Sequence, residues 1–136
     1  MIAVPIRIAV GLGCDRGTPA ETIARAVAEA LDSAGLDAAQ VQAAASITLK
    51  ADELGLLAFA AGQGWPLAFY SPEQLAAVPV PNPSETVRQY TGTPSVSEAA
   101  ALLAAGADKN HLMVEKHKLR GPDGRSATVS IARIPQ

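Results

Sequence analysis

Strand-like and helix-like stretches alternate along the first half of the chain, and this order constrains the fold more than any other feature. Apolar runs typical of short strands occupy residues 6–10, 41–47 and 66–70. Each run is followed by apolar residues at helical spacing, over residues 20–31, 50–61 and 71–77. Strands that alternate with helices through short connections form parallel sheets with right-handed crossovers. The first half therefore predicts a parallel sheet flanked by helices.

The second half adds one more helix and a hairpin. Three prolines in residues 78–83 exclude a regular element there, and residues 96–105 form a helical pattern that Gly106 ends. Residues 111–119 and 125–134 then flank a Gly-Pro-Asp-Gly turn, which predicts an antiparallel hairpin. The predicted fold is a three-layer α/β/α arrangement with a mixed, mainly parallel sheet and a C-terminal antiparallel hairpin. At 136 residues, we expect a single domain over residues 1–136.

Composition excludes several classes of protein. The formal net charge of −2 argues against a nucleic-acid binder, and no stretch approaches the roughly 20 apolar residues of a membrane span. The apolar start is too short for a signal peptide, so we expect a cytoplasmic protein. A single cysteine, Cys14, excludes an internal disulfide, and with only two histidines it offers no metal-ligand spacing. We therefore expect no metal, no cofactor, and neither nucleic acid nor membrane as a partner.

A glycine-rich stretch at residues 11–19 joins the first predicted strand to the first helix. Thr18 is a suitable N-cap, Pro19 suits the first helical position, and Glu21 stands at capping-box spacing. The free N–H groups of a helix start, with Arg16 beside them, attract anions. The alternative interpretation is a turn and a helix cap without a ligand.

The tripeptide Gly-Thr-Pro occurs again at residues 92–94, before the helix of residues 96–105, with Ser95 and Glu98 at capping-box spacing. If both loops follow the same sheet edge, they face one crevice, where open α/β sheets bind ligands. The alternative is that Gly-Thr-Pro is only an efficient way to begin a helix. On a strand, Lys116 and Lys118 would project to one face, with Glu115 and His117 on the other. The candidate ligand-binding residues are Gly11, Gly13, Cys14, Arg16, Gly17, Thr18, Lys50, Gly92, Thr93, Ser95 and Lys116.

The glycine spacing does not fit a nucleotide site. The spacing departs from the dinucleotide-binding fingerprint, and no acidic residue ends the second predicted strand, as that fingerprint requires. A phosphate-binding loop is excluded because no Gly-Lys-Ser/Thr run follows the glycines. Cys14 is a candidate nucleophile, because a helix start and Arg16 would lower its pKa, but a small structural residue is the alternative. For an enzyme, the candidate acids, bases or nucleophiles are Cys14, Glu21, Glu98 and His117. Whether the chain is an enzyme stays open at this point.

Blocks of sequence in a fixed order resemble a known family. They comprise residues 11–18, 45–56, 92–103, 112–116 and 128–133, and together they resemble the cobalamin-biosynthesis protein CobE and the C-terminal domain of CbiG. The resemblance implies a role in making the corrin ring. Longer members open a lactone on a cobalt-precorrin and release acetaldehyde. This chain has no room for their other regions and looks like the stand-alone form of the oxygen-dependent, late-cobalt route, so hydrolase activity is not carried over.

The candidate binding residues suit the kind of ligand that the resemblance implies. Corrin precursors are flat, largely apolar macrocycles edged with carboxylates, which helix starts, Arg16, Lys50 and Lys116 would suit. The candidates for stacking on the ring are Trp65, Phe69 and Tyr70, although core or sheet-edge positions are favoured for these aromatic residues. The leading hypothesis is binding or processing of an anionic precorrin or corrinoid. The alternatives are a hydrolase-like enzyme of the pathway, and an interaction module that assists other cobalamin-pathway enzymes as its partners.

Overall fold

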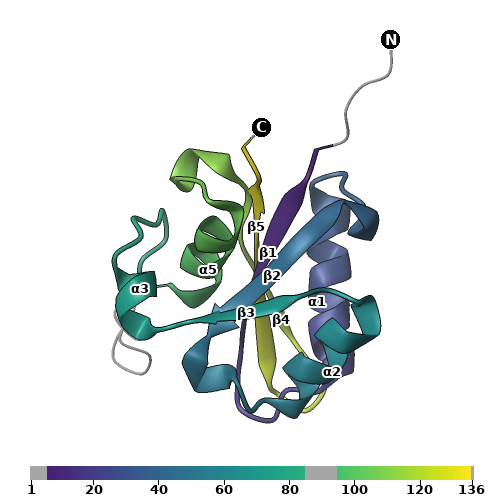
Figure 1. Cartoon of the computed structure of the whole chain (residues 1–136). Helices are drawn as coiled ribbons and strands as arrows, with labels where there is room; N and C mark the ends of the chain where they lie inside the picture. Colours follow the sequence, from purple (N-terminus) through teal and green to yellow (C-terminus); the bar gives the residue numbers. More distant parts are fainter. Residues whose placement is uncertain (1–5, 85–94, 136) are drawn as a thin grey trace.

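The sheet has five strands in the order β3-β2-β1-β5-β4 (Figure 1). The computed structural model describes residues 6–84 and 95–135. The strands are β1 (Ile8–Cys14), β2 (Val41–Ile47), β3 (Leu67–Tyr70), β4 (Leu112–Arg120) and β5 (Ser126–Arg133). β1, β2 and β3 pair in parallel, and β5 is antiparallel to both β1 and β4. Four of these strands therefore run in one direction, which confirms the mixed, mainly parallel sheet and the C-terminal hairpin.

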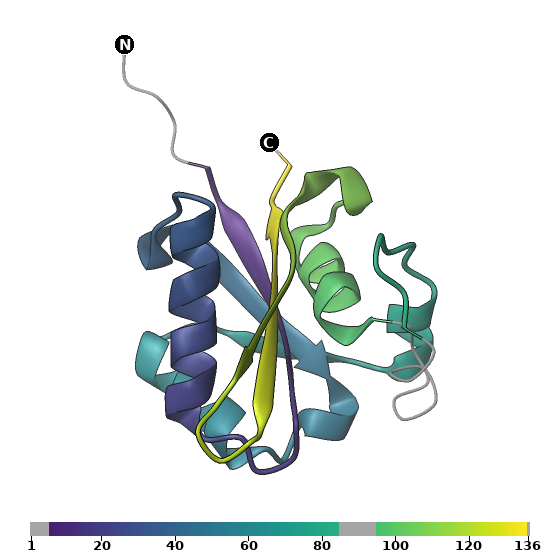
Figure 2. The same ribbon diagram turned by 180° about the vertical axis from the view of Figure 1, so that it is seen from behind.

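Helices cover both faces of the sheet, so the three predicted layers are confirmed (Figure 2). On one face lie α1 (Ala20–Ser33) and α2 (Leu54–Gln63), which pack against each other. On the other face lie α3 (Pro72–Ala76) and α5 (Val96–Ala105). Three short 3-10 turns, η1 (Ala38–Gln40), η2 (Thr48–Lys50) and η3 (Lys109–His111), lead into β2, follow it and precede β4 respectively. Within the described residues, no helix is long and apolar enough to cross a membrane.

Large and small residues alternate along β1 and decide how closely each helix layer approaches. Ile8, Val10 and Leu12 are fully buried in the core under α1. Between them, Ala9 and Gly11 face α5. A Cβ added at Gly11 would lie 1.9 Å from the Ser97 carbonyl oxygen, so the backbone of α5 rests directly on β1.

The first strand is longer than predicted, and the loop after it is shorter. We predicted a strand over residues 6–10 and a glycine loop over residues 11–19, whereas β1 runs through Cys14. The reason is that β1 is central and pairs on both sides, with Gly11 opposite Ala45 of β2 and Ser130 of β5. Gly11 and Gly13 are therefore strand residues, of which Gly11 makes room for α5, and the connection to α1 begins at Asp15.

The predicted capping of α1 is wrong. The N-cap residue is Pro19, and no side chain caps the helix. The Thr18 hydroxyl instead donates to the Asp15 carbonyl oxygen at 2.7 Å, which closes the turn before the helix. Glu21 is exposed and forms no capping box.

The other boundaries are mostly confirmed. β2 spans residues 41–47 and α5 spans residues 96–105, as predicted, and Gly106 ends α5 with a φ of 65°. Ser71 and Gln74 form the expected capping box at α3. The helix predicted from residue 50 begins later, at Leu54, because Thr48–Lys50 forms a 3-10 turn first. Residues 85–94, which hold most of a predicted short helix and the second Gly-Thr-Pro loop, lie outside the described residues.

Candidate functional site

A cavity of about 660 Å³ opens at the edge of the sheet where β1, β2 and β4 end and β5 begins. The first residues of α5 line one side of this cavity. Carboxyl ends of parallel strands are the usual place for ligands in open α/β sheets, and here the antiparallel β5 brings its first residues to the same edge. The cavity is lined by Gly13, Cys14, Asp15, Arg16, Ile47, Lys50, Ser84, Ser95, Val96, Ser97, Lys116, Lys118, Ser126 and Thr128.

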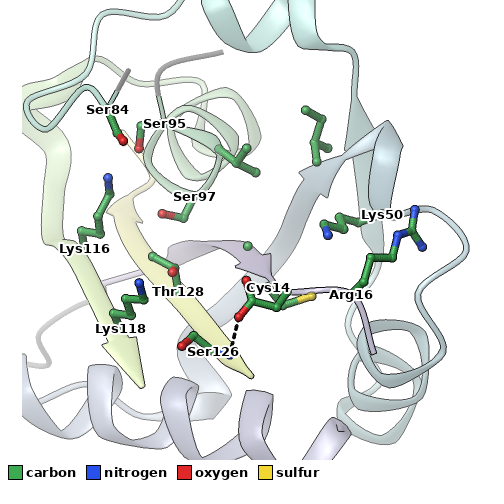
Figure 3. A pocket seen from close by; sticks show the side chains of 14 residues that line it. Cys14, Arg16, Lys50, Ser84, Ser95, Ser97, Lys116, Lys118, Ser126 and Thr128 are labelled. Atoms are coloured by element: carbon green, nitrogen blue, oxygen red, sulfur yellow. Dashed lines mark hydrogen bonds between the residues drawn. The ribbon is translucent and has the colours of Figure 1, made fainter. Parts of the chain in front are cut away.

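Cationic side chains stand on two sides of the cavity. Figure 3 shows Lys116 and Lys118 of β4 on one side and Lys50 and Arg16 on the other, with hydroxyl groups between them. The Lys116 ammonium donates to the Asn82 carbonyl oxygen at 3.1 Å. Within residues 6–84 and 95–135, Lys50 and Lys118 make no ion pair or side-chain hydrogen bond. Their charges are therefore available to an anionic ligand.

A bulge in β4 sets the directions of its side chains. Val114 pairs with Ile131 and His117 with Val129, so Glu115 and Lys116 together stand opposite one residue of β5. As predicted, Lys116 and Lys118 share a side, and both line the cavity.

Glu115 departs from the predicted alternation, because the bulge turns it away from His117. Its Oε1 accepts from Nδ2 of Asn82 at 3.1 Å, the same residue that Lys116 contacts. His117 Nε2 contacts the Glu29 carboxylate of α1 at 2.8 Å, on the far face of the sheet. His117 is consequently not part of the cavity.

Arg16 reaches the cavity rim, but its charge already has partners. Its Nη1 donates to the carboxylates of Asp52 at 2.7 Å and of Glu53 at 2.8 Å, and its Nη2 donates to the Leu49 carbonyl oxygen at 2.6 Å. The Arg16 hydrogen bond holds the pKa of Asp52 below its usual value. The Gly17 N–H also donates to Glu53, at 3.2 Å. The predicted anion site at this loop is thus occupied by the protein's own carboxylates.

Cys14 lines the cavity with a thiol of low reactivity. Burial raises the pKa of Cys14 to about 11, and the positive charge of Lys50 only partly opposes this effect. The pKa was expected to fall because of the start of α1, but Cys14 belongs to β1 and lies ahead of that helix. At neutral pH the thiol is protonated, which does not favour a nucleophile.

Ser95 and Glu98 do not form the predicted capping box at α5. Asn82 donates to Glu98 Oε2 at 2.7 Å, and among the described residues the buried Glu98 Oε1 has no hydrogen-bond partner. The Ser95 hydroxyl lines the cavity, and it too is buried without a partner in the described part of the chain. The hydrogen bond between Asn82 and Glu98 therefore connects the segment before residue 84 to α5. The Ser95 hydroxyl is available to a ligand.

The structure brings together part of the predicted set. Of the candidate residues, those that line the cavity are Gly13, Cys14, Arg16, Lys50, Ser95 and Lys116. Those placed elsewhere are Gly11 under α5, Gly17 and Thr18 in the turn, exposed Glu21, buried Glu98, and His117 on the far face. Gly92 and Thr93 lie outside the described residues. The sequence candidates omitted Asp15, Ile47, Ser84, Val96, Ser97, Lys118, Ser126 and Thr128.

For two of the residues missing from the sequence candidates, the sequence pattern did indicate a shared direction of the side chains. Ser126 and Thr128 alternate with buried Ala127 and Val129 along β5, so their hydroxyls share the other face of the strand. The aromatic candidates belong to the hydrophobic cores. Trp65 packs edge-on against Phe59, with ring centroids 5.5 Å apart, and Phe69 and Tyr70 join the clusters on the two faces of the sheet.

Within the described part of the chain, no three His, Cys, Asp or Glu side chains are grouped to hold a metal ion.

Residues 8–132 match the family described as cobalamin synthesis G C-terminus. The chain belongs to this CbiG C-terminal family. A cobalt-precorrin-5A hydrolase of Priestia megaterium is 39% identical over 131 residues, which cover 96% of this chain but 33% of that protein. The chain therefore spans about a third of that relative's length.

Two proteins named CobE are also similar to this chain. Protein CobE of a Sinorhizobium species is 40% identical over 103 residues, covering 74% of this chain and 67% of that protein. The crystal structure of a CobE from the cobalamin pathway superposes with a TM-score of 0.81 at 29% identity, and the match covers 100% of this chain and 99% of that one. Family and fold therefore agree along the chain.

Proposed function

We propose that this cobalamin-biosynthesis protein binds an anionic precorrin or corrinoid intermediate in the cavity at the sheet edge. The observation that carries the proposal is the set of lysines on facing sides of one cavity: Lys50 opposite Lys116 and Lys118. Hydrogen bonds between ammonium and carboxylate groups are among the stronger interactions of proteins. A macrocycle edged with carboxylates fits such a lining, and the family's pathway supplies that class of molecule.

The lining favours binding over nucleophilic catalysis. The Cys14 thiol is protonated at neutral pH, and His117 lies on the other face of the sheet. The activity in the name of the Priestia megaterium relative belongs to a protein about three times as long. We therefore propose a binding role, with turnover as a separate outcome of the same experiment.

The test is a titration of the purified protein with hydrogenobyrinic acid and with a precorrin, followed by the visible absorption of the macrocycle. Saturable binding with an unchanged macrocycle mass supports the proposal. A change in ligand mass that depends on the protein would instead show an enzyme. Absence of binding to every pathway macrocycle, with a pathway enzyme co-purifying from cobalamin-producing cells, would contradict the proposal and indicate an interaction module.

A further inference from the structure

We propose that the cavity receives the carboxylate-bearing edge of the macrocycle and leaves the faces of the ring outside; this inference rests on the proposed function. The first argument is the chemistry of the lining. Hydroxyl groups of Ser97, Ser126 and Thr128 lie between the two lysine-bearing sides of the cavity. None of the aromatic side chains that the structure describes lines the cavity. A surface that stacks on a flat ring is normally apolar and aromatic. The described part of this lining has no aromatic ring and combines apolar surface with hydrogen-bond donors that suit carboxylates.

The spacing of the cations gives the second argument. Lys50 follows β2, whereas Lys116 and Lys118 belong to β4, and β1 and β5 lie between these strands. Three strand spacings place β2 and β4 about 14 Å apart. A ligand that carries at least two carboxylates well separated along one edge can therefore engage both sides at once. The periphery of a polycarboxylate macrocycle has that arrangement.

Ser95 provides a third contact, beside Ser84 on the Lys116 side of the cavity (Figure 3). Its hydroxyl lines the cavity and is buried without a partner among the described residues, and the residue is 1% exposed. It begins α5, whose first N–H groups have no partner within the helix. A buried hydroxyl without a hydrogen bond is unfavourable, so a ligand oxygen at this point removes an existing penalty. We assign this place to a carboxylate of the bound edge.

Size agrees with partial enclosure. A cavity of about 660 Å³ is of the size that encloses most of a drug-sized ligand. A corrin ring with its acetate and propionate side chains is larger than a ligand that this cavity can enclose. One edge fits, and the rest of the ring extends from the sheet.

The orientation is tested by quenching the fluorescence of bound, metal-free hydrogenobyrinic acid with acrylamide, a neutral quencher. Edge-first binding leaves the ring exposed, so the bound ligand keeps at least about half of the quenching constant of the free ligand, whereas an enclosing pocket buries about 70–90% of its ligand. A drop of the quenching constant by more than about threefold would show an enclosed ring and overturn the inference, while the proposed function would stand. If neither the acid nor a precorrin binds at all, the proposed function itself fails.

The contacts are tested with two ligands and one variant. The same macrocycle with its side-chain carboxyls converted to amides is expected to bind at least about 100-fold more weakly, because two or more charge-assisted hydrogen bonds are lost. Ser95→Ala should weaken binding of the acid about tenfold without lowering the melting temperature. Equal affinity for acid and amide, or no effect of Ser95→Ala on acid binding, would contradict the edge-first arrangement while binding of the acid itself remained.

Discussion

At the scale of residues, glycines near one another in β1 and its connection serve different purposes. Gly11 has no side chain because the backbone of α5 passes directly above it, and Gly17 has a φ of 77°, which favours glycine in the turn before α1. From the sequence alone both were interpreted as parts of a loop that approaches a ligand. The alternation of Ile8, Val10 and Leu12 with smaller residues was the signal that the strand continues.

Gly11→Ala is expected to destabilise the protein by about 2–3 kcal/mol, because the new methyl group overlaps the α5 backbone. Gly62→Ala is the matched control: Gly62 lies in α2 with no atom within 4 Å of an added Cβ. The control should be neutral or stabilise by up to about 1 kcal/mol. Urea unfolding measures both, and equal free energies of unfolding for the two variants would contradict the close approach of α5.

The Cys14 thiol is expected to react slowly at pH 8 and faster as the pH rises through about 11, because burial raises its pKa to about 11. The unfolded chain loses this proton near 9, so the folded state should lose stability as the pH rises from about 9 to 11. Iodoacetamide labelling followed by mass spectrometry measures the first effect, and Cys14→Ser should reduce the second. A labelling midpoint at or below pH 9 would show that the thiol is not buried as described.

At the scale of elements, the starts of the helices show what local sequence could and could not predict. Three α-helix starts carry a capping-box spacing, and among them the box forms only at Ser71 and Gln74 of α3. The 3-10 turn η1 forms another box, between Asp37 and Gln40. Thr18 and Glu98 have the correct spacing, yet their side chains find partners in the turn and in Asn82. Sequence spacing does not show which partner a side chain selects: a carbonyl of the preceding turn replaces the cap at α1, and the more distant Asn82 replaces it at α5.

Ser71→Ala should lower the free energy of unfolding by about 1 kcal/mol, the usual effect of removing an N-cap. Ser95→Ala should leave it unchanged or raise it by about 1 kcal/mol, because the buried Ser95 hydroxyl has no hydrogen bond to the described residues that can be lost. Chemical denaturation compares the two variants directly. If Ser95→Ala proves as destabilising as Ser71→Ala, the Ser95 hydroxyl has a partner in the free protein and the ligand contact assigned to it is wrong.

At the scale of the whole molecule, the order of strands and helices was enough to predict the three layers and the sheet edge at which the cavity lies. Cys14 and Lys50 follow from that order, because each stands at or just after the end of a parallel strand. Ser97, Ser126 and Thr128 could not be placed in the same way. They reach the cavity through the antiparallel register of β5 on β1 and the close packing of α5, which only the three-dimensional structure defines.

We expect residues 1–136 to unfold as one domain, since the helices on both faces share the strands of one sheet. Circular dichroism and calorimetry should give coincident, single transitions. Two separate transitions, one for β1–β3 with α1 and α2 and another for α5 with the hairpin, would contradict this expectation.

The most direct test of the central claim is the affinity of the Lys50→Ala/Lys116→Ala variant for hydrogenobyrinic acid, measured by isothermal titration. Loss of two ammonium contacts on facing sides of the cavity should weaken binding at least about 100-fold. Arg25→Ala removes one exposed cation of α1, away from the cavity, and should leave the affinity unchanged. The same affinity in the double variant as in the unchanged protein would contradict binding of an anionic corrinoid in this cavity.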